Sequence, residues 1–119
     1  MLVKTQAKVA CFSTWCVAYV DPEIGKYYYS LIPKARYAQR QMWPSHVTVV
    51  RKDLESAEAL DWNQYDGAIV EVQYENKIRF TNNYYWLDAW SKDIEKIRVS
   101  LGLPPYRFDT YHITVGNTK

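Results

Sequence analysis

Apolar and polar residues alternate most clearly in two short stretches, His46 to Val50 and Asp109 to Val115. Alternation with a period of two places successive side chains on opposite faces of a strand. Each stretch therefore predicts a strand with one apolar face in a core and one polar face turned outward. A third stretch, Lys8 to Val20, is rich in β-branched and aromatic residues and predicts one long first strand.

The remaining segments predict helices, a hairpin and loops. The clearest helix begins at Ser91 as N-cap, has Ile94 and Ile97 on one face, and stops at Gly102. We also expect one or two short helices within 23–42, a helical turn over 53–60 and a loop over 61–67. The stretch 68–81 predicts a hairpin with its turn at 75–77, in which Val70 and Val72 face inward. Strands in both halves around one clear helix predict an α+β class.

Length and charge limit the possible functions. The 119 residues predict one domain, 1–119, whose core needs neither disulfides nor a structural metal. A net charge of +2 is too small for binding to duplex DNA, which requires many phosphate contacts, but it suits a small anionic substrate. No apolar run is long enough for a signal peptide or a membrane span, so we expect a soluble, cytoplasmic protein with no membrane partner.

The two cysteines, Cys11 and Cys16, both fall within the predicted first strand. Five positions along one strand separate two side chains by roughly 16 Å and place them on opposite faces, which is too far for a disulfide. We therefore expect two reduced thiols, which are typical of a cytoplasmic protein.

The chain contains only two histidines, and both begin the same four-residue frame: His46-Val47-Thr48-Val49 and His112-Ile113-Thr114-Val115. In a strand, the His and Thr of each frame project from one face while the apolar residues anchor the other. If the two strands lie near each other, the cleft between them presents two imidazoles and two hydroxyls. A neutral imidazole removes a proton, a protonated one donates a proton, and the threonines hold phosphate oxygens. The catalytic candidates are therefore His46, Thr48, His112 and Thr114.

A single His-x-Thr frame is most often a half-buried structural histidine, and only its duplication favours chemistry. A zinc site made of His46 and His112 with Asp53 or Asp109 has no recognised ligand spacing and leaves the threonines unexplained. We therefore expect no metal and no other cofactor.

The two frames resemble the signature of the 2H phosphoesterase superfamily, two His-x-Thr/Ser-x motifs, at 46–49 and 112–115. This resemblance implies a bilobal α+β fold with a pseudo-two-fold axis, in which antiparallel sheets flanked by helices face a central cleft. It also implies metal-independent cleavage of phosphodiesters in ribonucleotides that carry a 2′-hydroxyl. Members include RNA 2′,3′-cyclic phosphodiesterases, RNA end-healing enzymes, and small phage enzymes that destroy cyclic oligonucleotide immune signals (anti-CBASS proteins), which the short chain resembles most.

We therefore expect a phosphodiesterase that cleaves 3′-5′ linkages of cyclic di- or oligonucleotides, acting in the host cytoplasm if the chain is phage-encoded. Two alternatives stay open: an enzyme that opens 2′,3′-cyclic phosphates at RNA ends, and a non-catalytic protein that sequesters a nucleotide. The sequence leaves open which histidine is the acid, the base preference and the oligomeric state.

Cations and aromatic residues near the frames are candidates for substrate binding. A guanidinium pairs well with phosphate oxygens, and an aromatic ring can stack on a base. Lys34, Arg36 and Arg40 form a basic cluster that is able to guide an anion but is more typical of an exposed helix face. The candidates closest to the frames are Arg51 and Arg107 for phosphate, and Tyr19, Trp43, Tyr106 and Tyr111 for a base.

Overall fold

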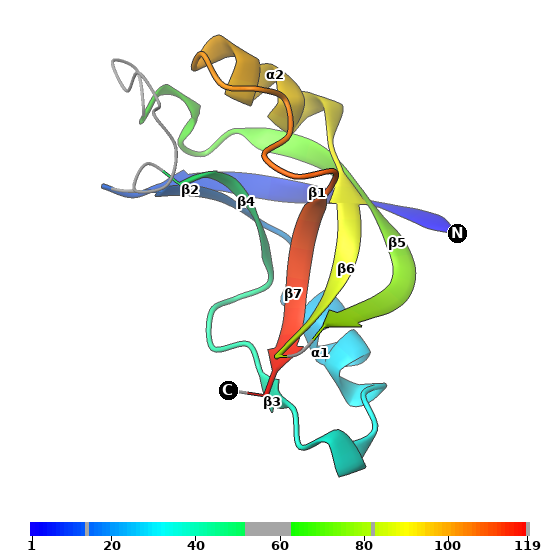
Figure 1. Cartoon of the computed structure of the whole chain (residues 1–119). Helices are drawn as coiled ribbons and strands as arrows, with labels where there is room; N and C mark the ends of the chain where they lie inside the picture. Colours follow the sequence, from blue (N-terminus) through cyan, green and yellow to red (C-terminus); the bar gives the residue numbers. More distant parts are fainter. Residues whose placement is uncertain (14, 52–62, 82, 119) are drawn as a thin grey trace.

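The computed structural model describes residues 1–13, 15–51, 63–81 and 83–118. Strands account for 48% of these residues and helices for 23%, so the architecture is mostly sheet. In chain order the elements are β1 (Leu2–Cys11), β2 (Trp15–Tyr19), α1 (Pro22–Ser30), the 3-10 helix η1 (Lys34–Arg36), β3 (Gln39–Arg40), β4 (His46–Arg51), β5 (Ile69–Thr81), β6 (Tyr84–Trp90), α2 (Lys92–Ser100) and β7 (Tyr111–Asn117) (Figure 1).

The strands form one antiparallel sheet that closes on itself. Their order is β3-β7-β4-β2-β1-β5-β6, and β6 pairs again with β7. Six strands therefore make a closed ring, and the two-residue β3 is attached to β7 outside it (Figure 1). A single cluster of buried side chains, drawn from the six ring strands and both α-helices, forms the core.

The expected bilobal fold, with helix-flanked sheets in two pseudo-symmetric lobes, is therefore wrong. Strand β1 pairs with β2 on one side and with β5 on the other, so backbone hydrogen bonds join the two halves of the chain directly. Pairing of β6 with β7 closes the ring, and no separate second core is left within the described ranges. The two α-helices are short and cannot flank two sheets.

The predicted helices are confirmed. Helix α1 follows Asp21, whose carboxylate accepts a hydrogen bond from the Glu23 amide, and η1 follows it within the expected range. In α2, the Ser91 hydroxyl accepts from the Ile94 amide, and Gly102 ends the helix with a φ of 80°. Within the described ranges, neither these nor any other helix has the length and apolar character needed to cross a bilayer.

Two strand predictions are wrong because they place the chain reversals at the wrong positions. The stretch 8–20 is a β1–β2 hairpin rather than one strand, and the sequence between the two strands, 12–14, contains no Gly, Pro or Asn to mark a turn. The predicted hairpin over 68–81 is instead the 13-residue strand β5, whose irregularity between Tyr74 and Ile78 is a register shift against β6. Val70 and Val72 do face inward, whereas the helical turn expected over 53–60 lies outside the described residues.

The chain reversal between β1 and β2 brings the two cysteines together. Cys11 and Cys16 are register partners across the hairpin, and the Cys16 thiol donates to the Cys11 sulfur at 2.6 Å. The expected separation of roughly 16 Å is wrong because it assumed one uninterrupted strand. The inference that the protein is cytoplasmic because its two cysteines are too far apart for a disulfide therefore does not hold. Burial raises the pKa of both thiols, so each is protonated at neutral pH.

Oxidised glutathione should convert this pair to an intramolecular disulfide. Both thiols give up their hydrogen, the two sulfurs join, and the glutathione disulfide is reduced to two molecules of glutathione. The rate should rise from neutral to alkaline pH, because the raised pKa values make thiolate scarce at neutral pH. Mass spectrometry of the Cys11–Cys16 peptide measures the loss of two hydrogen atoms, and Cys11→Ser is the control that cannot close the bond. A wild-type product carrying only glutathione adducts would contradict the opposed placement.

Candidate active site

The two His-x-Thr frames lie on neighbouring strands. On β4 and β7, Val47 and Ile113 are antiparallel partners, and both side chains are 0% exposed. Antiparallel register then sets His46 across from Thr114, and Thr48 across from His112. The frames are thus related by a local two-fold through the Val47–Ile113 pair, although the whole fold has no two lobes.

All four polar side chains of the frames line one pocket of about 180 Å³, which we call the motif pocket. Three arginines line it as well: Arg51 from β4, Arg98 from α2 and Arg107 from the segment before β7. The described residues that line this pocket include no Asp or Glu. The arrangement favours a small anion, because positive charges on the walls of a cleft concentrate anions there.

Arg98 is the least exposed of these cations, with 2% of its surface accessible. Its Nε donates to the Pro104 carbonyl at 2.8 Å and its Nη1 donates to the Val49 carbonyl at 2.8 Å. The side chain therefore ties α2 to β4 and to the segment that leads toward β7. It holds two walls of the motif pocket together and places a positive charge behind them.

His46 has a fixed tautomer. Its Nδ1 lies 2.7 Å from the Pro44 carbonyl oxygen, which accepts only if Nδ1 carries the hydrogen. In the neutral ring, Nε2 is then the atom with the free lone pair. The rings of Trp15 and Tyr19 pack edge-on at centroid distances of 5.7 and 6.2 Å. Burial among these groups lowers the pKa of His46, and the Pro44 contact offsets part of that shift.

His112 has a different neighbourhood. The rings of Trp86 and Phe108 lie 5.2 and 6.2 Å from it, and Phe108 is parallel to it within 4°. Asp88 on β6 is its register partner across the strand pair. Burial lowers the pKa of His112, whereas the Asp88 carboxylate acts to raise it. The negative charge of Asp88 therefore favours the imidazolium form of His112.

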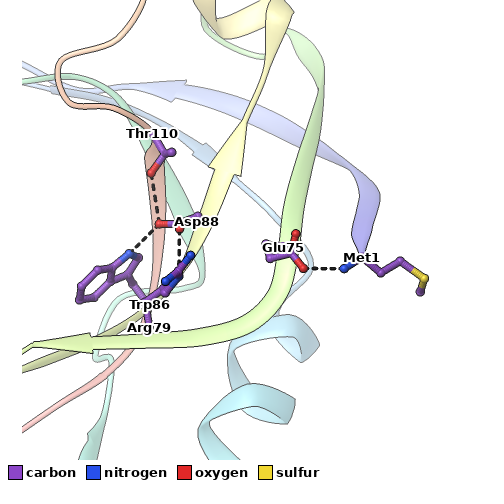
Figure 2. A network of polar contacts seen from close by, with 6 residues as sticks. All are labelled: Met1, Glu75, Arg79, Trp86, Asp88 and Thr110. Carbon is purple, nitrogen blue, oxygen red and sulfur yellow. Dashed lines mark hydrogen bonds and ion pairs between the residues drawn. The ribbon is translucent and has the colours of Figure 1, made fainter.

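A network of hydrogen bonds fixes Asp88 in place (Figure 2). One carboxylate oxygen accepts from Trp86 Nε1 at 2.9 Å and from the Thr110 hydroxyl at 3.2 Å. The other oxygen lies 3.3 Å from Nε of Arg79 on β5. Asp88 therefore positions Trp86, whose ring lies against His112, and links three segments around this histidine.

The structure brings some of the predicted binding residues to the motif pocket. Arg51, Arg107 and Tyr111 line it, and the Arg107 guanidinium lies 4.8 Å above the Phe108 ring. Tyr111 is 6% exposed and its hydroxyl donates to the Pro105 carbonyl, so this residue shapes the wall more than it offers an open stacking face.

Other predicted binding residues lie beside the pocket or away from it. Tyr19 contacts the His46 ring, and Trp43 packs against Trp15 at 5.5 Å and lines a neighbouring pocket. Tyr106 lines a different pocket and donates its hydroxyl to Glu95 at 3.0 Å, where burial raises its pKa to about 12. Tyr106 is therefore not among the groups around the histidines.

Sequence reasoning missed several residues that surround the histidines. Trp15 was missed because its segment was predicted as the middle of a strand. Trp86 and Asp88 alternate on one face of β6, a signal present in the sequence, but only the pairing of β6 with β7 shows that this face meets His112. The remaining missed residues are Arg98, Phe108 and Thr110.

Comparison of the chain with models of protein families, with curated proteins and with solved structures finds no significant match. The resemblance to the 2H phosphoesterase superfamily therefore rests on the two motifs and stays a prediction.

Both histidines should titrate below 6.5, the ordinary value, because burial disfavours the imidazolium form. The chain has two histidines, so an NMR titration follows two imidazole Cε1–H signals, and His46→Gln assigns them. Nitrogen-15 spectra above both midpoints should show His46 protonated at Nδ1. A midpoint at or above 6.5 for either residue, or an Nε2-protonated His46, would contradict the geometry.

Proposed function

We propose that this protein is a metal-independent phosphodiesterase that cleaves 3′-5′ linkages in cyclic di- or oligonucleotides. The observation that supports it is the motif pocket, where both His-x-Thr frames meet beside Arg51 and Arg107. A base, an acid, two hydroxyl donors and guanidinium groups are the set that transfer of a phosphodiester requires. If the chain is phage-encoded, the host cytoplasm is the proposed place of action.

In this proposal His46 is the general base. Its Nδ1–H bond to the Pro44 carbonyl leaves Nε2 able to accept a proton, and its lowered pKa keeps the ring neutral near pH 7. Nε2 removes the proton of the ribose 2′-hydroxyl, and the 2′-oxygen forms a bond to the adjacent phosphorus. A free 2′-hydroxyl is therefore a requirement of the substrate.

His112 is the general acid. As the 2′-oxygen attacks, the bond between phosphorus and the 5′-oxygen breaks, and His112 gives its proton to that oxygen. The products are a 2′,3′-cyclic phosphate and a 5′-hydroxyl, and solvent returns the proton from His46 to His112. Asp88 stabilises the imidazolium that this step consumes, because its carboxylate is the negative charge acting on His112.

Thr48 and Thr114 donate to the non-bridging phosphate oxygens, and Arg51 and Arg107 balance the charge that grows on them in the transition state. Fixed donors act strongly in a partly buried pocket, because little solvent has to reorganise during the reaction. The buried Arg98 contributes a further positive charge from behind the wall.

His46→Ala and His112→Ala should each lower kcat by about 10²–10⁴-fold, because each removes one proton-transfer group. Thr48→Val and Thr114→Val keep the side-chain shape and should lower kcat by about 10²-fold through loss of one donor. The assay uses cyclic dinucleotides, cyclic trinucleotides, 2′,3′-cyclic-ended RNA and plain RNA in EDTA, with products identified by mass spectrometry.

The same assay separates the rival functions. Linear products from cyclic oligonucleotides support the proposal, whereas turnover of 2′,3′-cyclic RNA ends alone would identify an RNA end-processing enzyme. A ligand recovered intact after denaturation would identify a sequestering protein. Cleavage that disappears with EDTA, or near-normal activity of either histidine variant, would overturn the mechanism.

Asp88→Asn should shift only the alkaline limb of the profile of log(kcat/KM) against pH. Activity requires neutral His46 and protonated His112, so it falls as pH drops through the pKa of His46 and as pH rises through the pKa of His112. Removing the Asp88 charge lowers the pKa of His112, so the alkaline limb moves to lower pH and the acid limb stays. The other charges around the two rings, on Arg51, Arg98 and Arg107, are unchanged in this variant.

Glu75→Gln is the matched control, since it removes a carboxylate of β5 that pairs with the amino terminus rather than with the motif pocket (Figure 2). It should leave both limbs in place. A shift of the acid limb in Asp88→Asn would reverse the assignment of acid and base, and the NMR midpoints of the same variant show whether His112 itself has changed.

A further inference from the structure

A second pocket adjoins the motif pocket, and we call it the side pocket. It has a volume of about 450 Å³ and lies among the first turns of α1, the segment from β3 to β4, and β7. Thr114 lines both pockets. Pro44, whose carbonyl accepts from His46, also lines the side pocket. A ligand that extends from one pocket into the other therefore passes the Thr114 hydroxyl.

The motif pocket is too small for the whole of the proposed substrate. Sites for small molecules usually enclose about 300–1,000 Å³, and the motif pocket lies below that range. It has room for the scissile phosphate and part of a ribose. The two pockets together fall within the range, so the side pocket supplies the space that a dinucleotide requires.

The side pocket carries the charge that a phosphate requires. Lys26 projects from α1 and Arg40 from β3, and the described residues that line the pocket include no acid. Lys26 pairs with Glu23 at 3.4 Å, but both side chains are largely exposed, so the interaction is weak in water. The Asp21 carboxylate is engaged in capping α1. A net positive site therefore remains beside Thr114.

An aromatic side chain lies at the same place. Trp43 lines the side pocket and is 55% exposed. It packs against Trp15, which in turn contacts the His46 ring. An exposed indole offers a stacking surface for any base, because every base has a π-face. Two cations and an exposed indole thus occur together in the side pocket.

The wall between α1 and the segment before β4 is already close-packed. A Cβ atom at Gly25 would overlap the Ser45 hydroxyl, which would have to rotate away, so the helix and this segment are in direct contact here. The Ser45 carbonyl accepts from the Val20 amide at 3.0 Å, which holds the same segment to the sheet. The side pocket is formed before a ligand arrives, and preformed sites lose less entropy on binding.

We propose that the side pocket binds the nucleotide next to the scissile linkage, with Lys26 and Arg40 on its phosphate and Trp43 on its base. This inference rests on the proposed function and narrows it. The preferred substrate is an oligonucleotide with a phosphate beyond the one that is cleaved. A dinucleoside monophosphate such as adenylyl-3′,5′-adenosine has only the scissile phosphate and leaves Lys26 and Arg40 without a phosphate to bind.

Steady-state kinetics on two substrates test the assignment. For a 3′-5′ cyclic diadenylate, Arg40→Ala and Lys26→Ala should each raise KM by about tenfold, with kcat within about twofold, because they remove a contact to a phosphate that does not react. For adenylyl-3′,5′-adenosine, which has the same linkage and 2′-hydroxyl but only the scissile phosphate, the KM of the same variants should rise by much less. Lys34→Ala on the neighbouring η1 is the control, since Lys34 is exposed and lines a different pocket. Equal effects on both substrates, or an equal effect of Lys34→Ala, would overturn the proposal.

A binding measurement separates failure of the side pocket from failure of catalysis. Isothermal titration of the His46→Ala protein with cyclic diadenylate gives a Kd without turnover, and adding Arg40→Ala should weaken it by about tenfold, whereas adding Lys34→Ala should not. No binding, or equal binding by both double variants, would overturn the side pocket. If the wild-type protein cleaves neither nucleotide, the proposed function fails, and this titration still decides whether the side pocket holds a nucleotide.

Discussion

Val47 and Ile113 face each other across β4 and β7 with both side chains fully buried, and the geometry of the site depends on this contact. Burying an aliphatic side chain of this size contributes about 1.5–3 kcal/mol. A slip of either strand by one residue would bring that side chain out of the core and turn a histidine into it. The core therefore fixes the register, and the register sets each histidine opposite the threonine of the other frame.

The local two-fold of the two frames does not extend to their environments. A backbone carbonyl contacts His46, whereas a carboxylate held by three partners acts on His112. A carbonyl dipole fixes a tautomer and carries no net charge, while a carboxylate stabilises a cation. Two equal motifs thus have unequal surroundings, with a carbonyl dipole at His46 and a negative charge at His112.

Local pattern was enough to predict β4, β7, α1 and α2, because alternation and capping are properties of neighbouring residues. The polar faces of both frames were predicted for the same reason. The reversal between β1 and β2 was not predicted, since aromatic residues and β-branched residues that favour strands flank it. Asn76 indicated a turn that the long pairing of β5 overrides. The closed ring, the cysteine pair and Asp88 beside His112 come from contacts between distant segments, which local pattern does not encode.

Strand β7 follows the other five ring strands in chain order, and it pairs with β4 on one side and with β6 on the other. The ring therefore stays open on the ribosome until residues 111–117 have been synthesised and released from the exit tunnel. The same strand carries His112 and Thr114. Closure of the core and completion of the pocket are consequently one event, and a nascent chain that lacks β7 has neither.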